Sequence, residues 1–273
     1  MNPRIAKLNL LNSKSINDVK LFSLTNTMDT GYVTDYYGHN DIKYAETWPY
    51  EHFNYVINDF GFRGDVLPRE VDIAAFGCSF TFGTGLAQDM TWHNLLAKEL
   101  NRTSFNFGLP AKSIQSIVDI FLIVSKHIKM SNAVFLFPSI SRLQIAKTSP
   151  DSKKVYYLNT CVDFKSEVNR MFEVSEDAVY RAIPDEEMCK ICKNQVYLLE
   201  HIAKERNINV YIGCWEYESY CFLKELELEY ITLLPPWKSE TIEFADSDKA
   251  RDGTHPGPKH HFKWMNEIKG YIK

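Results

Sequence analysis

Three residues of the sequence have the types and the spacing that acyl transfer requires. Ser79 stands in the glycine-flanked stretch GCSFTFG at 77–83, and Asp252 and His255 stand in DGTHP at 252–256. Acyl transfer needs a nucleophile, a base that takes its proton, a group that orients the base, and donors for the oxyanion. We therefore expect Ser79 to be the nucleophile, His255 the general base, and Asp252 the carboxylate that holds the imidazole in the correct tautomer.

Short apolar runs that alternate with helical patterns must bring these two stretches together. Five runs are expected to be strands: 71–76, 104–107, 133–137, 208–215 and about 229–234. Helices are expected at about 91–100, 113–129, 185–206 and from near Pro258 onward. This alternation predicts an α/β fold with a five-stranded parallel sheet, helices on both faces, and ligands bound outside the carboxyl ends of the strands.

The chain is expected to form one main domain with two additions. Residues 1–57 are polar and aromatic without a sustained period, which predicts an N-terminal extension that packs on the main domain at 58–273. A polar and aromatic stretch at about 143–183 interrupts the alternation, and we interpret it as an insertion over one face.

Three motifs resemble those of the SGNH hydrolases, also called GDSL-type esterases and lipases. GCSFTFGTG resembles the Gly-Asp-Ser nucleophile block with Cys78 in place of aspartate, and DGTHPGP resembles the Asp-x-x-His-Pro block. NDFGFRGD at 58–65 resembles the lead-in that is common in bacterial and phage members. The resemblance covers roughly Asn58 to Lys273 apart from the insertion. It implies a flavodoxin-like, three-layer α/β/α fold and a carboxylic ester hydrolase that forms an acyl-Ser79 intermediate.

The oxyanion hole is where this chain departs from the family that it resembles. The resemblance implies backbone N–H donors at Ser79 and Gly108, but the family's asparagine after the third strand is missing and PSISR stands at 138–142. Arg142 is the first candidate for the missing donor, because a guanidinium has fixed donors and a positive charge, and the Ser141 hydroxyl is the second. Three interpretations stay open: a replaced donor, a weak enzyme, or a retired site.

The expected substrate is a carboxylic ester, with an O-acetylated carbohydrate as the first interpretation and a simple acyl ester as the second. The residues expected beside it are Cys78, Phe80, Trp215 and Tyr217. A thiol at Cys78 could itself attack, but no neighbour in sequence marks it as activated, so a small buried residue is the preferred interpretation. Two other functions fit the sequence: an O-acyltransferase with the same triad, and a non-catalytic carbohydrate-binding, virion or structural module that keeps the fold.

Composition and charge narrow the expected partners. The 31 Lys and Arg residues and 35 Asp and Glu residues give a net charge of −4 without a block of like charges, so nucleic acid is not an expected partner. No apolar run approaches the roughly 18 residues that a membrane span needs. The first residues do not form a secretory signal, so we expect a cytoplasmic protein, or one in a virion or host cytoplasm if the chain comes from a phage. No metal or cofactor is expected, since Cys189-x-x-Cys192 lacks a second ligand pair at suitable spacing, and the oligomeric state stays open.

Overall fold

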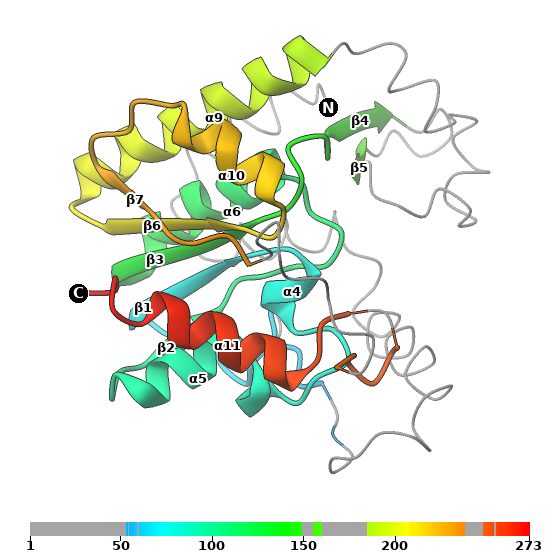
Figure 1. Cartoon of the computed structure of the whole chain (residues 1–273), viewed down its shortest axis with the longest axis vertical. Coiled ribbons are helices and arrows are strands. Elements are labelled where there is room, and N and C mark those ends of the chain that lie inside the picture. Colours follow the sequence, from blue (N-terminus) through cyan, green and yellow to red (C-terminus); the bar gives the residue numbers. More distant parts are fainter. Residues whose placement is uncertain are drawn as a thin grey trace.

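The core of the protein is a five-stranded parallel sheet (Figure 1). The computed structural model describes residues 53, 55–58, 60–148, 155–159, 185–237, 248–253 and 255–273. In spatial order the strands are β2 (Ser104–Asn106), β1 (Glu70–Gly77), β3 (Lys129–Phe137), β6 (Asn209–Cys214) and β7 (Ile231–Leu233). Every neighbouring pair is parallel, which confirms the predicted sheet.

Strand β1 shows why short apolar runs form this sheet. Ala74 and Phe76 belong to the hydrophobic cluster on one face, whereas Ile73 and Ala75 belong to the cluster on the other. Side chains alternate between the two faces of a strand, so a strand that is covered on both sides must be apolar at nearly every position. β1 is therefore a central strand, and the residues that follow Gly77 emerge at the carboxyl end of the sheet.

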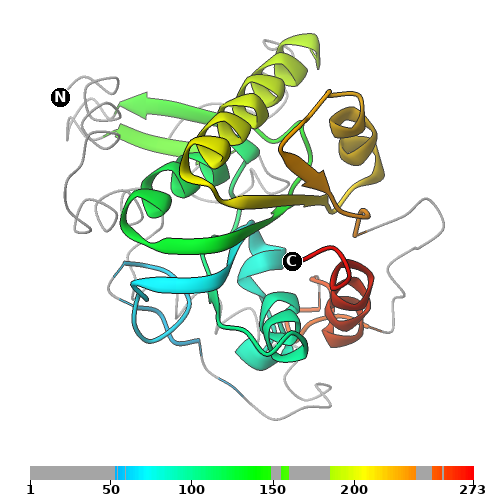
Figure 2. The ribbon, with the colours of Figure 1, turned by 90° about the vertical axis from the view of Figure 1, so that its left-hand side faces the viewer.

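Helices cover both faces and complete the predicted α/β/α layers. α6 (Ile114–His127), α9 (Asp185–Arg206) and α10 (Tyr217–Lys224) pack on one face, and α5 (Trp92–Glu99) and α11 (Pro258–Ile268) pack on the other. Figure 2 shows this division, with the red α11 and the teal α5 on one side of the sheet and the yellow-green α9 on the other. The hydroxyl of Ser113 accepts the backbone N–H of Ser116 at 3.3 Å and so caps the start of α6.

Several elements differ from the expectations. The stretch after β1, expected to be a turn, is the one-turn helix α4 (Ser79–Phe82), and a 3-10 turn, η2 (Gln88–Met90), precedes α5. Helix α10 was not predicted either, because its eight residues are too few to show a clear helical period.

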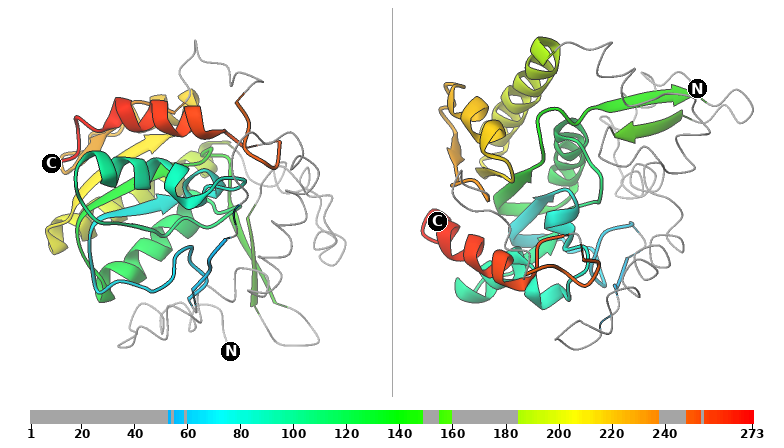
Figure 3. Two further views of the ribbon diagram at one scale, coloured as in Figure 1. Left: turned by 90° about the horizontal axis from the view of Figure 1, so that it is seen from below. Right: turned by 45° about the vertical axis from the view of Figure 1, so that its right-hand side comes forward.

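The described part of the insertion contains a second, small sheet. β4 (Gln144–Thr148) pairs antiparallel with β5 (Val155–Asn159), and Figure 3 shows this pair beside the main sheet rather than within it. No strand was expected there. The remainder of the insertion, and the extension before Phe53, lie outside the described residues, so the division at residue 57 stays a prediction.

Among the helices that the structure describes, none has both the length and the apolar character to cross a membrane.

Candidate active site

Asp252 and His255 form a close pair in the loop before α11. His255 Nδ1 lies 2.5 Å from Asp252 Oδ2, and the His255 backbone N–H donates to Asp252 Oδ1 at 3.0 Å. A carboxylate only accepts hydrogen bonds, so an imidazole proton lies on Nδ1, and Nε2 is the ring nitrogen that would exchange a proton with a nucleophile. The Asp252 side chain is 7% exposed and that of His255 is 25% exposed. The pair therefore has the tautomer and the access that a general base needs.

Backbone contacts fold this loop back on itself. The Ala250 N–H donates to the His255 carbonyl at 2.8 Å, and the Gly253 N–H donates to the Ala250 carbonyl at 2.8 Å. Gly253 has a φ of 72°, in the left-handed region that favours glycine. Because Asp252 and His255 are only three positions apart, this turn brings the carboxylate of Asp252 to the imidazole of His255.

Ser79 is the first residue of α4, directly beyond the carboxyl end of β1. Its side chain is half-buried, and Cys78 before it is buried at 2% exposure. The chain can turn here because position 77 is glycine: a Cβ on Gly77 would lie 2.1 Å from Thr81 Oγ1 and 2.8 Å from the Leu136 carbonyl. The first N–H groups of a helix have no acceptor within it, so the Ser79 N–H has no partner within α4.

The nucleophile stretch and the His–Asp loop meet in the structure. The Arg251 N–H donates to the Gly85 carbonyl at 2.9 Å, and a Cβ built on Gly85 would lie 3.1 Å from the Asp252 nitrogen. The Phe80 and His255 rings also make an edge contact with centroids 5.9 Å apart. Two stretches separated by about 170 residues are thus in direct contact.

Ser79 and His255 do not share a hydrogen bond in this structure. Among the described residues, the His255 side chain contacts Asp252 through Nδ1 and the Phe80 ring through its edge. Catalytic hydrogen bonds in unliganded enzymes are often long and tighten only when substrate binds.

Gly108 lies against α4, where the resemblance placed an oxyanion donor. A Cβ there would lie 2.7 Å from the Phe82 nitrogen, so only glycine fits. The Gly108 N–H donates to Asn106 Oδ1 at 2.9 Å, and Asn106 Nδ2 donates to the Thr81 carbonyl at 2.9 Å. Asn106 therefore engages both the expected donor and the nucleophile turn.

Sequence reasoning placed Asn106 after the second strand but gave it no role in the site. It is 1% exposed at the end of β2. Its signal was a polar side chain directly after an apolar strand residue and two residues before Gly108.

Ser141 and Arg142 lie in the loop that follows the carboxyl end of β3. The Arg142 guanidinium carbon lies 5.8 Å from the centre of the Trp215 ring, and Arg142 Nη1 donates to the Lys112 carbonyl at 3.4 Å. Ser141 Oγ lies 2.8 Å from Ser139 Oγ. Arg142 is therefore held beside Trp215, and its role as the missing donor stays a prediction.

Phe80 is the centre of an aromatic cluster beside Ser79. Its ring centroid lies 4.7 Å from Trp215, 5.8 Å from Trp237 and 5.9 Å from His255. The structure thus brings two of the expected substrate residues together and adds Trp237, which sequence reasoning missed. Tyr217 instead pairs with Tyr220, at 6.2 Å between centroids, at the start of α10.

Two buried histidines flank this region without joining the pair. Burial, with a smaller effect of the Arg63 charge, lowers the pKa of His93 to about 3. Burial likewise lowers the pKa of His261 well below its ordinary value, and His261 Nδ1 accepts the Trp92 N–H at 3.1 Å. Both imidazoles are neutral at physiological pH and serve as buried hydrogen-bonding groups.

Two of the described cysteines, Cys192 and Cys214, are held in the protonated form by burial. Burial raises the pKa of Cys192 to about 12 and also raises that of Cys214. Among the described residues, no group of three His, Cys, Asp or Glu side chains is arranged to hold a metal ion.

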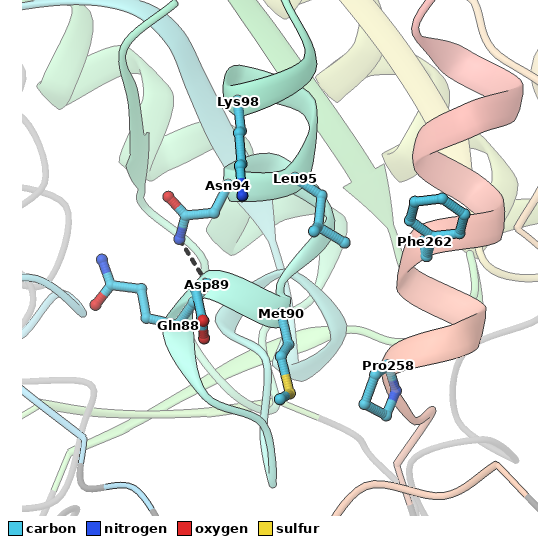
Figure 4. Close-up of a pocket in the computed structure, with 8 residues that line it drawn as sticks. All are labelled: Gln88, Asp89, Met90, Asn94, Leu95, Lys98, Pro258 and Phe262. Carbon is cyan, nitrogen blue, oxygen red and sulfur yellow. Dashed lines mark hydrogen bonds between the residues drawn. The ribbon is translucent and has the colours of Figure 1, made fainter. Parts of the chain in front are cut away.

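A separate surface hollow lies between η2, α5 and the start of α11 (Figure 4). Its volume is about 660 Å³, and its lining residues are Gln88, Asp89, Met90, Asn94, Leu95, Lys98, Pro258 and Phe262. None of the residues expected to bind or convert the substrate lines it.

Comparisons with known proteins give similar structures but no sequence family. No protein-family model and no curated protein matches the sequence. The solved structure of TesA is 11% identical, with a TM-score of 0.48 over 74% of this chain and 98% of that chain. An acetyl xylan esterase, Est2A, from the rumen bacterium Butyrivibrio proteoclasticus is 12% identical, with a TM-score of 0.45 over 77% of this chain and 65% of that chain. A GDSL-like lipase from Bacteroides thetaiotaomicron is 12% identical, with a TM-score of 0.37 over 75% of this chain and 87% of that chain.

All three TM-scores lie below 0.5, so the function proposed next rests on the residues of this chain alone.

Proposed function

We propose that the protein is a serine ester hydrolase with Ser79 as nucleophile, His255 as general base and Asp252 as the orienting carboxylate. The observation that carries this proposal is the Asp252–His255 pair, packed against the loop that follows Ser79. A histidine oriented by a carboxylate, on a loop that packs against a glycine-flanked serine turn, is the arrangement that activates a serine hydroxyl.

The reaction proceeds in two halves. Ser79 Oγ attacks the ester carbonyl carbon while His255 Nε2 takes the hydroxyl proton, and the carbonyl π electrons move to the oxygen. Collapse of this tetrahedral intermediate breaks the bond to the alcohol oxygen, which leaves with the proton from His255, and an acyl-Ser79 ester remains. A water molecule then repeats the attack with His255 as base, which releases the carboxylic acid and restores Ser79.

The geometry supports a small acyl group on a carbohydrate as the substrate. The buried Phe80 ring packs edge-on against the half-buried Trp215 next to the proposed nucleophile, and Arg142 lies over the Trp215 ring. Aromatic rings give apolar contact area, while a guanidinium donates hydrogen bonds to hydroxyl or carbonyl oxygens. An O-acetylated sugar has an apolar ring face, hydroxyl oxygens and a carbonyl oxygen for these contacts, whereas a simple acyl ester lacks the hydroxyls.

A fluorophosphonate probe tests the proposal, because it labels only activated serines. Wild type and Cys78→Ala are expected to be labelled, whereas Ser79→Ala is not; the cysteine variant is the matched control at the adjacent position. Ser79→Ala, His255→Ala and the double variant should lose turnover of a short-chain nitrophenyl ester to similar extents, since residues that act as a unit are not additive. Labelling of Ser79→Ala at the wild-type rate would contradict the assignment.

One observation favours a second candidate, a retired site that only binds. The Gly108 N–H is engaged by Asn106 rather than directed to an empty position. Wild-type protein that is neither labelled nor active on a broad panel of esters, yet binds acetylated oligosaccharides in calorimetry, would support this candidate over the hydrolase.

A further inference from the structure

Arg63 is a fully buried cation whose guanidinium donates hydrogen bonds to the turn that follows the proposed nucleophile. Its side chain is 1% exposed. Nη1 donates to the carbonyls of Phe82 and Gly83 at 2.8 and 2.9 Å, and Nη2 donates to the Leu86 carbonyl at 2.6 Å. The first two carbonyls belong to the end of α4 and its cap, where helix carbonyls lack intrahelical partners. One rigid guanidinium therefore fixes the spacing of three carbonyls within seven residues of Ser79.

Tyr55, which lies before Arg63 in the sequence, also contacts Arg63 and the same turn. The guanidinium carbon lies 4.8 Å from the centre of the Tyr55 ring and 5.5 Å from that of Phe82. The Tyr55 hydroxyl accepts the Gly85 N–H at 2.6 Å. Gly85 has a φ of 77°, so this turn has a conformation that needs glycine and external support.

A neighbouring contact reaches the loop that carries the His–Asp pair. The Arg251 guanidinium carbon lies 3.9 Å from the centre of the Phe53 ring, and Arg251 Nη1 donates to the Phe53 carbonyl at 3.2 Å. Phe53 also packs edge-on against Tyr55, with centroids 5.6 Å apart. Because the Arg251 N–H donates to the Gly85 carbonyl, the described residues between Phe53 and Arg63 contact both loops at the point where the loops meet.

We propose that Arg63 is a positioning residue that sets α4, and with it Ser79, in register with His255. It touches neither nucleophile nor base; it acts through the carbonyls of Phe82, Gly83 and Leu86. Packing alone does not explain a guanidinium here, since burying a charge is costly and an apolar side chain of similar size often stabilises a core equally well. The three directed donors are what an apolar side chain cannot supply. This inference rests on the proposed hydrolase function.

The test compares Arg63→Met, which keeps bulk but removes the donors, with the exposed control Arg69→Met. Both are assayed well below their unfolding midpoints, with folding checked by circular dichroism. We expect Arg63→Met to lower kcat and the rate of fluorophosphonate labelling together by about a hundredfold, the scale of a misplacement near 1 Å, with KM changed less than about threefold. Arg69→Met should match wild type.

Chemical rescue separates positioning from stability. Millimolar guanidinium should restore part of the labelling rate of Arg63→Ala, whereas methylammonium, which lacks the planar fork, should not. Guanidinium is a denaturant, so a defect in stability alone would worsen under the same treatment. Lack of rescue in a folded Arg63→Ala protein would overturn the inference.

Two milder variants decide the matter if the larger changes prevent folding. Arg63→Lys keeps the charge but lacks the planar fork of the guanidinium, and Tyr55→Phe removes the hydroxyl that accepts the Gly85 N–H. Each should lower kcat by about tenfold or more at unchanged KM, the loss that one hydrogen-bonding contact near 1.4 kcal/mol predicts. Wild-type kcat in both would overturn the inference while leaving the hydrolase intact, whereas failure of the proposed function itself shows as unlabelled, inactive wild type.

Discussion

The carboxylate of Asp252 contacts His255 twice: Oδ2 lies 2.5 Å from Nδ1, and Oδ1 accepts the backbone N–H at 3.0 Å. One side chain thus fixes both the tautomer of the imidazole and the backbone that carries it. The two contacts can be separated by substitution, because an amide keeps one accepting oxygen.

Asp252→Asn should preserve the fold and lose most of the activity. The amide oxygen can still accept the His255 backbone N–H, but the amide NH₂ can only donate toward Nδ1, which favours the wrong tautomer. We expect kcat to fall by about a thousandfold to ten-thousandfold, as in serine hydrolases generally when this carboxylate becomes an amide. Steady-state kinetics on a nitrophenyl ester, with the melting temperature as control, measures this. Activity within a few-fold of wild type would remove Asp252 from the triad.

Arg142→Ala tests the missing oxyanion donor. If the guanidinium contacts the oxyanion, kcat should drop about a hundredfold or more with little change in KM, since that contact forms mainly in the transition state. A variant with Ser141→Ala tests the second candidate in the same assay. If kcat survives in both, the oxyanion is held by backbone donors or by another residue.

Stability should decrease in acid because two histidines are buried in the neutral form. Burial lowers the pKa of His93 to about 3 in the folded protein, whereas the pKa of a free histidine is near 6.5. Below about pH 6.5 the unfolded chain therefore binds protons that the folded chain does not, and stability falls with decreasing pH. Each such histidine contributes up to about 1.4 kcal/mol per pH unit in this window.

Urea unfolding at several pH values checks this dependence. The slope between pH 6.5 and 4 should be reduced in His93→Gln and unchanged in His201→Gln, because His201 is exposed. Equal slopes in wild type and His93→Gln would contradict the buried neutral state.

Gly213→Ala should destabilise the protein through overpacking. A Cβ at this position of β6 would lie 2.6 Å from Trp264 Cζ2, and the Trp264 side chain is 1% exposed with its Nε1 donating to the Pro235 carbonyl. Inserting a methyl group into such a site costs about 1–3 kcal/mol. Gly270→Ala is the matched control, since nothing lies within 4 Å of its Cβ. The free energies of unfolding from urea titration should separate the two variants.

The sheet could be predicted from the sequence because its cause is local. A strand such as 133–137, covered on both faces, is apolar at every position, and this shows without knowledge of its neighbours. Helix α4 could not be predicted, because four residues contain no helical period. The β4–β5 strands have five residues each and lie within a stretch that was interpreted as an irregular insertion, so no alternation with helices indicated them.

The residues of the candidate site likewise fall into those that a local motif indicates and those that only the fold reveals. Ser79, Asp252 and His255 could be proposed from short motifs, since their chemistry is visible in adjacent residues. Asn106 and Arg63 could not, because each contacts backbone carbonyls about 20 to 25 positions away. Contacts with main-chain atoms leave no pairing of side-chain types in the sequence, and only the fold reveals them.

The hydrogen bond between the Arg251 N–H and the Gly85 carbonyl joins the two halves of the site through main-chain atoms alone. Main-chain groups are the same for almost every amino acid, so evolution can change the side chain at position 251 and keep this link. Proline is the exception, because it has no N–H to donate. Position 85 has no such freedom, since its φ of 77° and a Cβ only 2.7 Å from Ala250 Cβ exclude most side chains. The link between the two loops therefore tolerates a change of side chain at position 251, whereas the contacts of the Arg251 side chain with Phe53 do not.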